Sequence, residues 1–499
     1  MNKMTTENGT GYGTIFKTTF LFGFVQIFNI VVKVGINKIV AVLLGPEGMG
    51  IIGLFNTAIN TIKTGAGLGV SQSAVRDISE ANASNNYESF SRTISITNRV
   101  IIFTSLFGVI LTIVLSPLLS KWQFGNSSYT IAFLWLSIVV GLNILSDGQL
   151  AILKGMRQLK ALAKASMLGS VVGLISAIPF YYFFKEGGII PSLAVTAFAA
   201  LFFSNLYVKR IDYKKSRIPF KQFIGESSPM IKMGIALMFV GFIGSLFDMV
   251  VASLINNLGN LVDVGLYNAG ATIITGYFGV VITAMSTDYY PRISAVHRDN
   301  GKLAVEMNRQ SETGLVMILP LAVLFVFLSP LFIYFLYTET FLDAKDYTDY
   351  AMIGTVIIIV SNCMGMILLA KQASSIFIVS VISQKFLLLV IYYFLYQNMG
   401  LIGLGISYLM SGVIHLLTMI FILSHFYDIR LAKRIWLLLL LVILCIVITI
   451  FVRGLNNALI KYICGVIILL GSSVFSFFYM KQYMGIDIII KIKSRIKHD

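Results

Sequence analysis

Charged residues are scarce in this sequence. Aspartate, glutamate, lysine and arginine make up only 12% of its 499 residues, whereas soluble domains carry about 25%. Hydrophobic residues account for 57%, and the mean hydropathy is +0.85. This balance excludes an ordinary soluble domain and predicts an all-α polytopic membrane protein.

Cysteine is rare too. Cys363, Cys445 and Cys464 all lie in apolar segments, so they predict neither a disulfide framework nor a metal site. The start, MNKMTTENGTGYG, is polar, and the apolar stretch after it is far longer than the hydrophobic region of a signal peptide. We therefore expect no cleavable signal peptide.

The usual signatures of enzymes are missing. No loop exceeds about 25 residues, and no carboxylate–histidine pair or Ser/His/Asp spacing is present. His415 is the only histidine well inside an apolar segment, where a hydrogen-bonded core role is expected. The glycine-rich TGAGLGVS (64–71) follows no strand, so it indicates close helix packing or a flexible point rather than a nucleotide site. We expect a transporter that needs no cofactor or metal.

Long apolar stretches are what the sequence has instead. A membrane-spanning helix needs about 20 apolar residues, and fourteen stretches of this kind are present, of which the first, second, seventh and eighth are the more polar. They lie at about 15–44, 49–74, 95–119, 129–153, 163–184, 189–208, 230–256, 262–287, 313–337, 347–370, 374–396, 402–426, 434–453 and 458–480.

Positive charge is distributed unevenly between the two sides. With the amino terminus in the cytoplasm, 30 of the 38 lysines and arginines fall on cytoplasmic ends and loops, five on outer ones, and three inside spans. The densest clusters are VKRIDYKKSRIPFK (208–221) and KIKSRIKHD (491–499). This asymmetry predicts that both termini are cytoplasmic. The net charge of +16 thus reflects topology and attraction to anionic lipid, and we expect no nucleic-acid partner.

An internal repeat relates the two halves. Three pairs of segments resemble each other at offsets of about 213–217 residues: VLSPLLSKWQFG (114–125) with FLSPLFIYFLYT (327–338), VRDISEAN (75–82) with PRISAVHR (291–298), and ILKGMRQLKALAKAS (152–166) with LLAKQASSIFIVS (368–380). Six spans fit within one offset, so the halves point the same way, as in transporters with two lobes. We predict an N-terminal lobe at 1–221, a C-terminal lobe at 222–430, and two extra spans with a basic tail at 431–499.

Polar residues form stripes along the first two spans. Gln26, Asn29, Lys33 and Asn37 share one helical face in the first span, and Asn56, Asn60 and Lys63 share one in the second. A lysine at the bilayer centre costs roughly 2.5–3.5 kcal/mol, so both faces should look into protein or water. The amides fit either interhelical hydrogen bonding or substrate contact.

Each buried charge has alternative explanations. Lys33 could pair with Asp147 or Asp248, and Lys38 could extend its ammonium group to the outer surface. The two aspartates fit either partners for the lysines or a proton or sodium site that couples transport to an ion gradient. Lys63 is deep enough to favour a function.

A cationic, amide-lined face suits an anion that carries hydroxyl groups. Lysines in a low-dielectric site attract phosphate, and amides both donate and accept hydrogen bonds. Asn143 lies one turn before Asp147, and Arg76 lies near the cytoplasmic end of the second span. A phosphate carrying sugars cannot cross lipid unaided, because desolvating its charge costs too much.

The segment VVKVGINKIVAVLLGPEGMGIIGLFNTAINTIKTGAGLGVSQSAVRDI (31–78) resembles the amino-terminal part of O-antigen translocases. These are lipid-linked oligosaccharide flippases of the multidrug/oligosaccharidyl-lipid/polysaccharide exporter superfamily. Further similar segments are LKGMRQLKALAKASMLGSVVGLISA (153–177), YYPRISAV (289–296) and LLAKQASSIFIVSVISQ (368–384). The resemblance covers about residues 15–427.

This resemblance implies two six-helix lobes around a central cavity, often with two extra helices. It implies transport of undecaprenyl-pyrophosphate-linked glycan across the bacterial inner membrane by alternating access, beside a polysaccharide polymerase and a chain-length regulator. The pyrophosphate would contact Lys33, Lys63 and Arg76, and Gln26, Asn29, Asn60 and Asn143 would contact phosphate or sugar. The alternative within the superfamily is a cation-coupled multidrug exporter, which needs acidic residues in its cavity, as Asp147 and Asp248 would provide.

Overall fold

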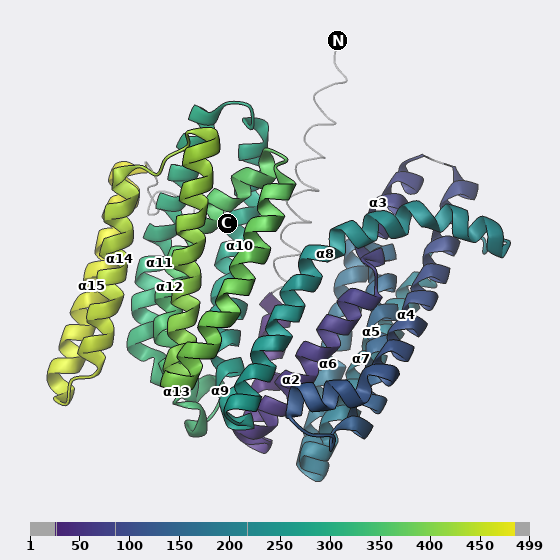
Figure 1. Ribbon diagram of the computed structural model, residues 1–499, viewed down its shortest axis with the longest axis horizontal. Helices are drawn as coiled ribbons and strands as arrows, with labels where there is room; N and C mark the ends of the chain where they lie inside the picture. The colour runs from purple at the N-terminus through teal and green to yellow at the C-terminus, as the bar shows by residue number, and fades with distance from the viewer. Residues whose placement is uncertain (1–24, 26, 85, 217, 485–499) are drawn as a thin grey trace, which may run out of the picture. The chain divides into compact units, whose positions relative to one another are not determined.

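The computed structural model describes residues 25, 27–84, 86–216 and 218–484. These residues form helices joined by short turns, with no β-strand among them, which confirms the all-α class (Figure 1). Nine helices of this part of the chain are long and apolar enough to cross a membrane. The count of fourteen spans is not confirmed. Two pairs of expected spans run together at 159–208 and 374–427, the helices at the expected second and eighth spans are short or interrupted, and the expected first span lies partly outside the described residues.

The chain forms two compact units, Met1–Gly265 and Leu266–Asp499. In the first unit, a helix at 27–43 is followed by seven helices and part of an eighth. They are α2 (Gly45–Ala66), α3 (Val70–Ala83), α4 (Tyr87–Phe124), α5 (Thr130–Gly155), α6 (Leu159–Phe184), the 3-10 turn η1 (Lys185–Gly188), α7 (Ile189–Val208), α8 (Phe220–Leu258) and α9 (Leu261–Ala271), whose last residues belong to the second unit.

The second unit contains the remaining helices. They are the π-helix η2 (Thr272–Phe278), α10 (Gly279–Ala295), α11 (Asn300–Leu336), the 3-10 turn η3 (Glu339–Phe341), α12 (Ala344–Ala370), α13 (Ser374–Tyr427), α14 (Lys433–Arg453) and α15 (Ala458–Tyr483). α12 packs along α13, and α11 packs against α12, α14 and α15. α13 joins two expected spans, which meet at Gly400, whose φ is +57°.

Two glycine breaks shape the start of the first unit. Gly45 (φ +67°) separates the helix at 27–43 from α2, and Pro46 lies in the first turn of α2, where its missing N–H costs nothing. The second break, at Gly67–Gly69, divides the expected span 49–74 into α2 and α3. Gly69 has φ +60°, a conformation that glycine adopts without strain.

Close contact with glycines holds α8 to the first unit. A Cβ on Gly69 would lie 2.0 Å from the carbonyl oxygen of Gly234 in α8, and one on Gly234 would lie 2.4 Å from that of Leu68. Arg92 of α4 forms an ion pair with Glu226 of α8, and its hydrogen bond lowers the pKa of Glu226. Within the first unit, α8 packs against α2, α3 and α4.

The internal repeat is visible as a recurring turn. Arg157 (φ +56°) is the middle residue of the α5–α6 connection, and Gln372 (φ +60°) is the middle residue of the α12–α13 connection. Both turns are closed by three equivalent backbone hydrogen bonds. One of these runs from Gln158 N–H to Leu153 O in the first turn and from Ala373 N–H to Leu368 O in the second, at 2.9 Å each. The equivalent residues are 215 positions apart, within the offset that the sequence predicts. The division into lobes at 1–221, 222–430 and 431–499 stays a prediction.

Candidate functional site

An ion pair joins α2 to α5 at the position of the second polar stripe. Lys63 Nζ lies 3.0 Å from Asp147 Oδ2, with 28% of the lysine and 44% of the aspartate side chain exposed. Both residues line a pocket of about 30 Å³, together with Ser71 of α3 and Thr104 of α4. A site of this polarity and size can hold one or two waters. The pair is thus only partly desolvated, and either charge can be reached by a small polar group.

The first polar stripe lies on the helix at 27–43, which packs against α6. Asn29 Oδ1 accepts a hydrogen bond of 3.4 Å from Ser170, and a Cβ on Gly35 would lie 3.2 Å from Leu174. Lys33 is exposed on this helix. Its alternative pairing with Asp147 is not the one present, since that aspartate contacts Lys63. Gln26 lies outside the described residues.

Arg76 lies on a separate helix because of the break at Gly67–Gly69. It belongs to α3, where its guanidinium group donates hydrogen bonds of 3.0 and 2.8 Å to Asp77 and stays half-exposed. The sequence placed Arg76 near the cytoplasmic end of the expected span 49–74. The structure instead gives Arg76 its own carboxylate partner.

The other candidates lie on the same helices. Asn60 is exposed on α2, Asn143 is half-buried on α5 one turn before Asp147, and Asp248 is exposed on α8. One turn before Asp248, the carbonyl of Ser245 accepts a hydrogen bond of 2.9 Å from Thr61 of α2. The first unit therefore brings Lys63 and Asp147 together, and it distributes the remaining described candidates over five helices.

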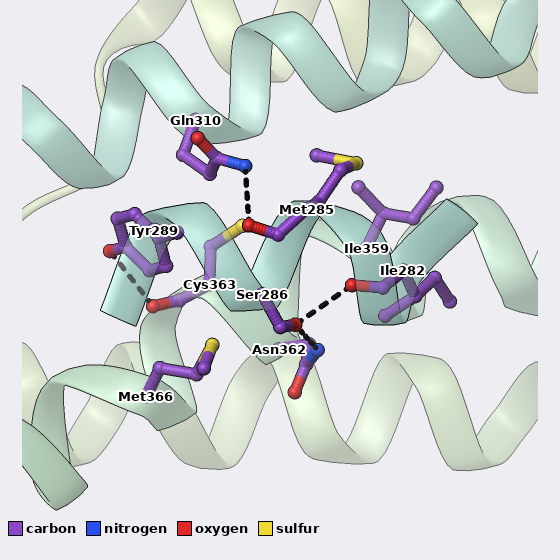
Figure 2. A pocket seen from close by; sticks show the side chains of 9 residues that line it. All are labelled: Ile282, Met285, Ser286, Tyr289, Gln310, Ile359, Asn362, Cys363 and Met366. Atoms are coloured by element: carbon purple, nitrogen blue, oxygen red, sulfur yellow. Dashed lines mark hydrogen bonds between the residues drawn. The ribbon is translucent and has the colours of Figure 1, made fainter. Parts of the chain in front are cut away.

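A polar cluster in the second unit corresponds to Arg76 in the repeat. Arg292 lies in the segment that resembles 75–82. It forms ion pairs with Asp288 at 3.1 Å and Glu306 at 2.5 Å, and it donates a hydrogen bond of 2.6 Å to the side-chain oxygen of Gln310. Figure 2 shows the small pocket beside it, where the Tyr289 hydroxyl donates to the carbonyl of Cys363 at 3.1 Å. The internal repeat relates Arg292 to Arg76 and could have identified this cluster from the sequence. Arg292 was not among the predicted site residues.

Two further ion pairs were missed from the sequence because their members lie at the ends of expected spans. Arg453 of α14 pairs with Asp349 of α12, and both side chains are about nine-tenths buried. Arg434 Nη2 lies 2.6 Å from Glu312 Oε2. The other oxygen of Glu312 accepts a hydrogen bond of 2.5 Å from Tyr479 of α15. These contacts hold α14 and α15 beside α11 at one edge of the second unit (Figure 1).

The described part of the chain shows no cluster of three or more histidine, cysteine, aspartate or glutamate residues that could hold a metal. His415 Nδ1 lies 2.8 Å from the hydroxyl of Ser361, which agrees with the predicted core hydrogen bond. The chemistry of the candidate site is therefore that of lysine ammonium groups, carboxylates and amides. The ammonium groups attract anions, the carboxylates compete with those anions, and the amides donate hydrogen bonds to them.

Comparisons with known proteins bear on this chemistry. A family described as "Polysaccharide biosynthesis protein" matches residues 39–346. The lipid III flippases of Escherichia coli (strain K12) and Shigella flexneri are each 21% identical over 407 residues, which cover 77% of this chain and 93% of the relative.

Solved structures share the fold. The lipid II flippase MurJ in an inward closed conformation matches with a TM-score of 0.68 and 15% identity, over 93% of this chain and 99% of that one. An inward-facing multidrug resistance MATE family transporter of the MOP superfamily matches with a TM-score of 0.65 and 17% identity, over 83% and 95%. The fold is thus that of a membrane transporter.

Proposed function

This chain belongs to the polysaccharide biosynthesis protein family, and from that premise we propose that it is a flippase for lipid-linked oligosaccharides. Its substrate is an undecaprenyl-pyrophosphate-linked unit of O-antigen or a related surface polysaccharide. The protein moves this unit from the cytoplasmic to the periplasmic leaflet of the bacterial inner membrane by alternating access, with both termini in the cytoplasm. A glycan polymerase and a chain-length regulator act on the product.

One observation carries the proposal: the first unit keeps a lysine within each of the first two spans that the sequence predicts, and both lysines are accessible to a polar group. Lys63 is half-desolvated and borders a pocket of water size, and Lys33 is exposed on the helix at 27–43. Lipid cannot satisfy an ammonium group. A pyrophosphate headgroup satisfies both lysines, and amides such as Asn29, Asn60 and Asn143 suit its sugars.

The ion pair of Lys63 suggests how the headgroup is released. Asp147 pairs with Lys63 when no other anion is present, and its carboxylate then neutralises the ammonium charge within the membrane. A pyrophosphate that binds Lys63 displaces the carboxylate, and return of Asp147 releases the headgroup. Arg76 attracts the pyrophosphate at the cytoplasmic end. Two repeat-related lobes, 1–221 and 222–430, supply the rocking motion, and a proton or sodium ion neutralises Asp147 or Asp248 during the exchange.

Replacement of Lys33 by alanine tests the proposal. We expect Lys33→Ala to abolish export of surface polysaccharide in a deletion strain complemented with the variant. The pyrophosphate headgroup would lose the positive charge of Lys33, which is not paired with Asp147. The readout is surface glycan by immunoblot, with membrane levels of the protein measured alongside. Lys38→Ala is the matched control, one or two turns further along the same helix, and should leave export near normal. Wild-type export by Lys33→Ala would exclude this residue from the site.

A cation-coupled multidrug exporter is the second candidate. Asp147 and Asp248 on helices of one unit are the observation that favours it, since acidic groups attract organic cations. Asp147 already contacts Lys63, which weakens its attraction for a cation. Sensitivity of a deletion strain to cationic dyes, with surface glycan intact, would support the exporter and overturn the flippase.

A further inference from the structure

A second polar cavity lies in the first unit, away from Lys33 and Lys63. It has a volume of about 1040 Å³ and is lined by α4, α5, α7 and residues of the segments 209–216 and 218–219. The expected spans of α4 and α7 begin at 95 and end at 208, so this cavity lies at the membrane boundary that the charge distribution predicts to be cytoplasmic. Its size is that of a site for a small molecule or a lipid headgroup.

The wall formed by residues 209–216 and 218–219 is fixed to α4. Arg99 donates a hydrogen bond of 2.7 Å to the carbonyl of Ile218, and its guanidinium carbon lies 5.1 Å from the centre of the Phe223 ring. The backbone N–H of Ser216 donates to Ser95 Oγ at 3.1 Å. These contacts keep the segment against the helix, so the cavity is a built feature of the unit.

The lining is cationic. Arg99, Lys209 and Lys215 line the cavity, and no acidic residue is among its lining residues. Both lysine side chains are exposed, and neither has an ion-pair partner among the described residues. Three positive groups around one cavity favour an anion, and a basic pocket at the cytoplasmic boundary is suited to a phosphate.

An amide network forms the inner side. Gln149 Nε2 donates to Asn98 Oδ1 at 3.0 Å, and Asn98 Nδ2 donates to the Tyr213 hydroxyl at 3.3 Å. This arrangement leaves the phenol proton of Tyr213 able to donate. Gln149 Oε1 is buried with no hydrogen-bond partner among the described residues, and such an acceptor needs a donor. A ligand with hydroxyl groups supplies one.

We propose that this cavity binds a glycerophosphate group, a phosphate ester that carries free hydroxyls. The cations hold the phosphate, and the buried oxygen of Gln149 accepts a hydrogen bond from a ligand hydroxyl. The group belongs either to phosphatidylglycerol of the inner leaflet or to a soluble glycerol phosphate. The site is independent of the flippase proposal, because it uses none of the residues assigned to pyrophosphate.

Binding to the full-length protein in a neutral detergent tests this site. The probes are dioctanoyl phosphatidylglycerol, dioctanoyl phosphatidylcholine and sn-glycerol 3-phosphate, measured by titration calorimetry. We expect phosphatidylglycerol to bind and phosphatidylcholine not to. Comparable binding of sn-glycerol 3-phosphate identifies a soluble ligand, and its absence identifies the lipid. Equal binding of the two lipids would overturn the proposal.

Two double variants separate the cavity from general attraction by the basic segment. Lys209→Gln/Lys215→Gln should weaken phosphatidylglycerol binding by roughly tenfold or more, because each lysine near an anionic headgroup contributes several-fold. Lys214→Gln/Lys221→Gln removes the same charge from exposed residues that do not line the cavity, and should change binding little. Equal losses in both variants would show that the cavity is not the site.

Gln149→Leu tests the hydroxyl contact. Wild-type protein should prefer phosphatidylglycerol over phosphatidylmethanol, an anionic lipid without headgroup hydroxyls, and Gln149→Leu should lose this preference. Size-exclusion profiles and helix content by circular dichroism show that each variant is folded. An unchanged preference in Gln149→Leu would remove the hydroxyl from the proposal.

Discussion

At the residue scale, the pairing of Lys63 with Asp147 explains how a membrane helix keeps a lysine. An unpaired lysine at the bilayer centre costs roughly 2.5–3.5 kcal/mol, and a carboxylate at 3.0 Å compensates most of its charge. The partial exposure of both groups reduces the strength of the attraction and leaves the pair able to exchange partners. Lys33 has no such arrangement with Asp147, so it is the better candidate for a lysine kept for an external anion.

Single and double variants of this pair distinguish a structural role from a transport role. Lys63→Met and Asp147→Asn should each lower the free energy of unfolding by about 1–2 kcal/mol, because each leaves a partly desolvated group without its partner. The double variant should recover much of this loss, as measured by thermal unfolding in detergent. If Lys63 also binds pyrophosphate, the double variant is stable and still exports no glycan. Restored export in the double variant would assign the pair to structure alone.

At the element scale, glycines decide where helices break and how closely they approach. The break at Gly67–Gly69 brings the backbone of α3 against α8, with no space for a side chain on Gly234. In a membrane, where hydrophobic attraction between helices is absent, such close backbone contact supplies much of the packing energy. The segment TGAGLGVS therefore serves the close packing that its composition suggested.

Alanine at Gly234 should disrupt this contact. We expect Gly234→Ala to lower the free energy of unfolding by about 1–3 kcal/mol, because the added methyl group would overlap the carbonyl of Leu68. Gly244→Ala is the matched control on the same helix, where a Cβ meets no atom within 4 Å and alanine favours the helix. Thermal unfolding of the two variants side by side provides the measurement, and similar values for both would show that the contact does not constrain α8.

At the scale of the whole molecule, α14 and α15 are integral parts of the second unit. Each end of α14 is fixed by an arginine, Arg434 to Glu312 and Arg453 to Asp349. Arg453 also donates a hydrogen bond of 2.9 Å to the carbonyl oxygen of Val326 in α11. These contacts define the position and orientation of the helical hairpin formed by α14 and α15. Contacts between apolar helix faces alone would specify that orientation only weakly in lipid.

Asp349→Asn tests this anchoring. It leaves the buried guanidinium group of Arg453 without its counter-charge, so we expect a loss of about 3–5 kcal/mol in the free energy of unfolding. Glu226→Gln breaks the Arg92 pair, which is exposed on both sides, and should cost no more than about 1 kcal/mol. Unfolding temperatures of purified variants compare the two. A loss in Asp349→Asn as small as that in Glu226→Gln would show that the hairpin is held by its apolar contacts.

The sequence by itself determined the all-α membrane class, the family and the offset of the repeat. Apolar length, charge asymmetry and glycine motifs are local properties of the sequence. They can therefore be recognised in each segment without knowledge of the tertiary structure. It also identified Lys63 and Asp147 as buried charges, although their partners stayed open.

Only the tertiary structure decided which charges meet and which helices contact. Arg76 lies on a separate helix because the positive φ values at Leu68 and Gly69 turn the chain. α8 approaches the Gly67–Gly69 break closely because Gly234 has no side chain. Arg453 and Asp349 are 104 residues apart. Their pairing depends on the packing of α12, α11 and α14, and no local pattern specifies it.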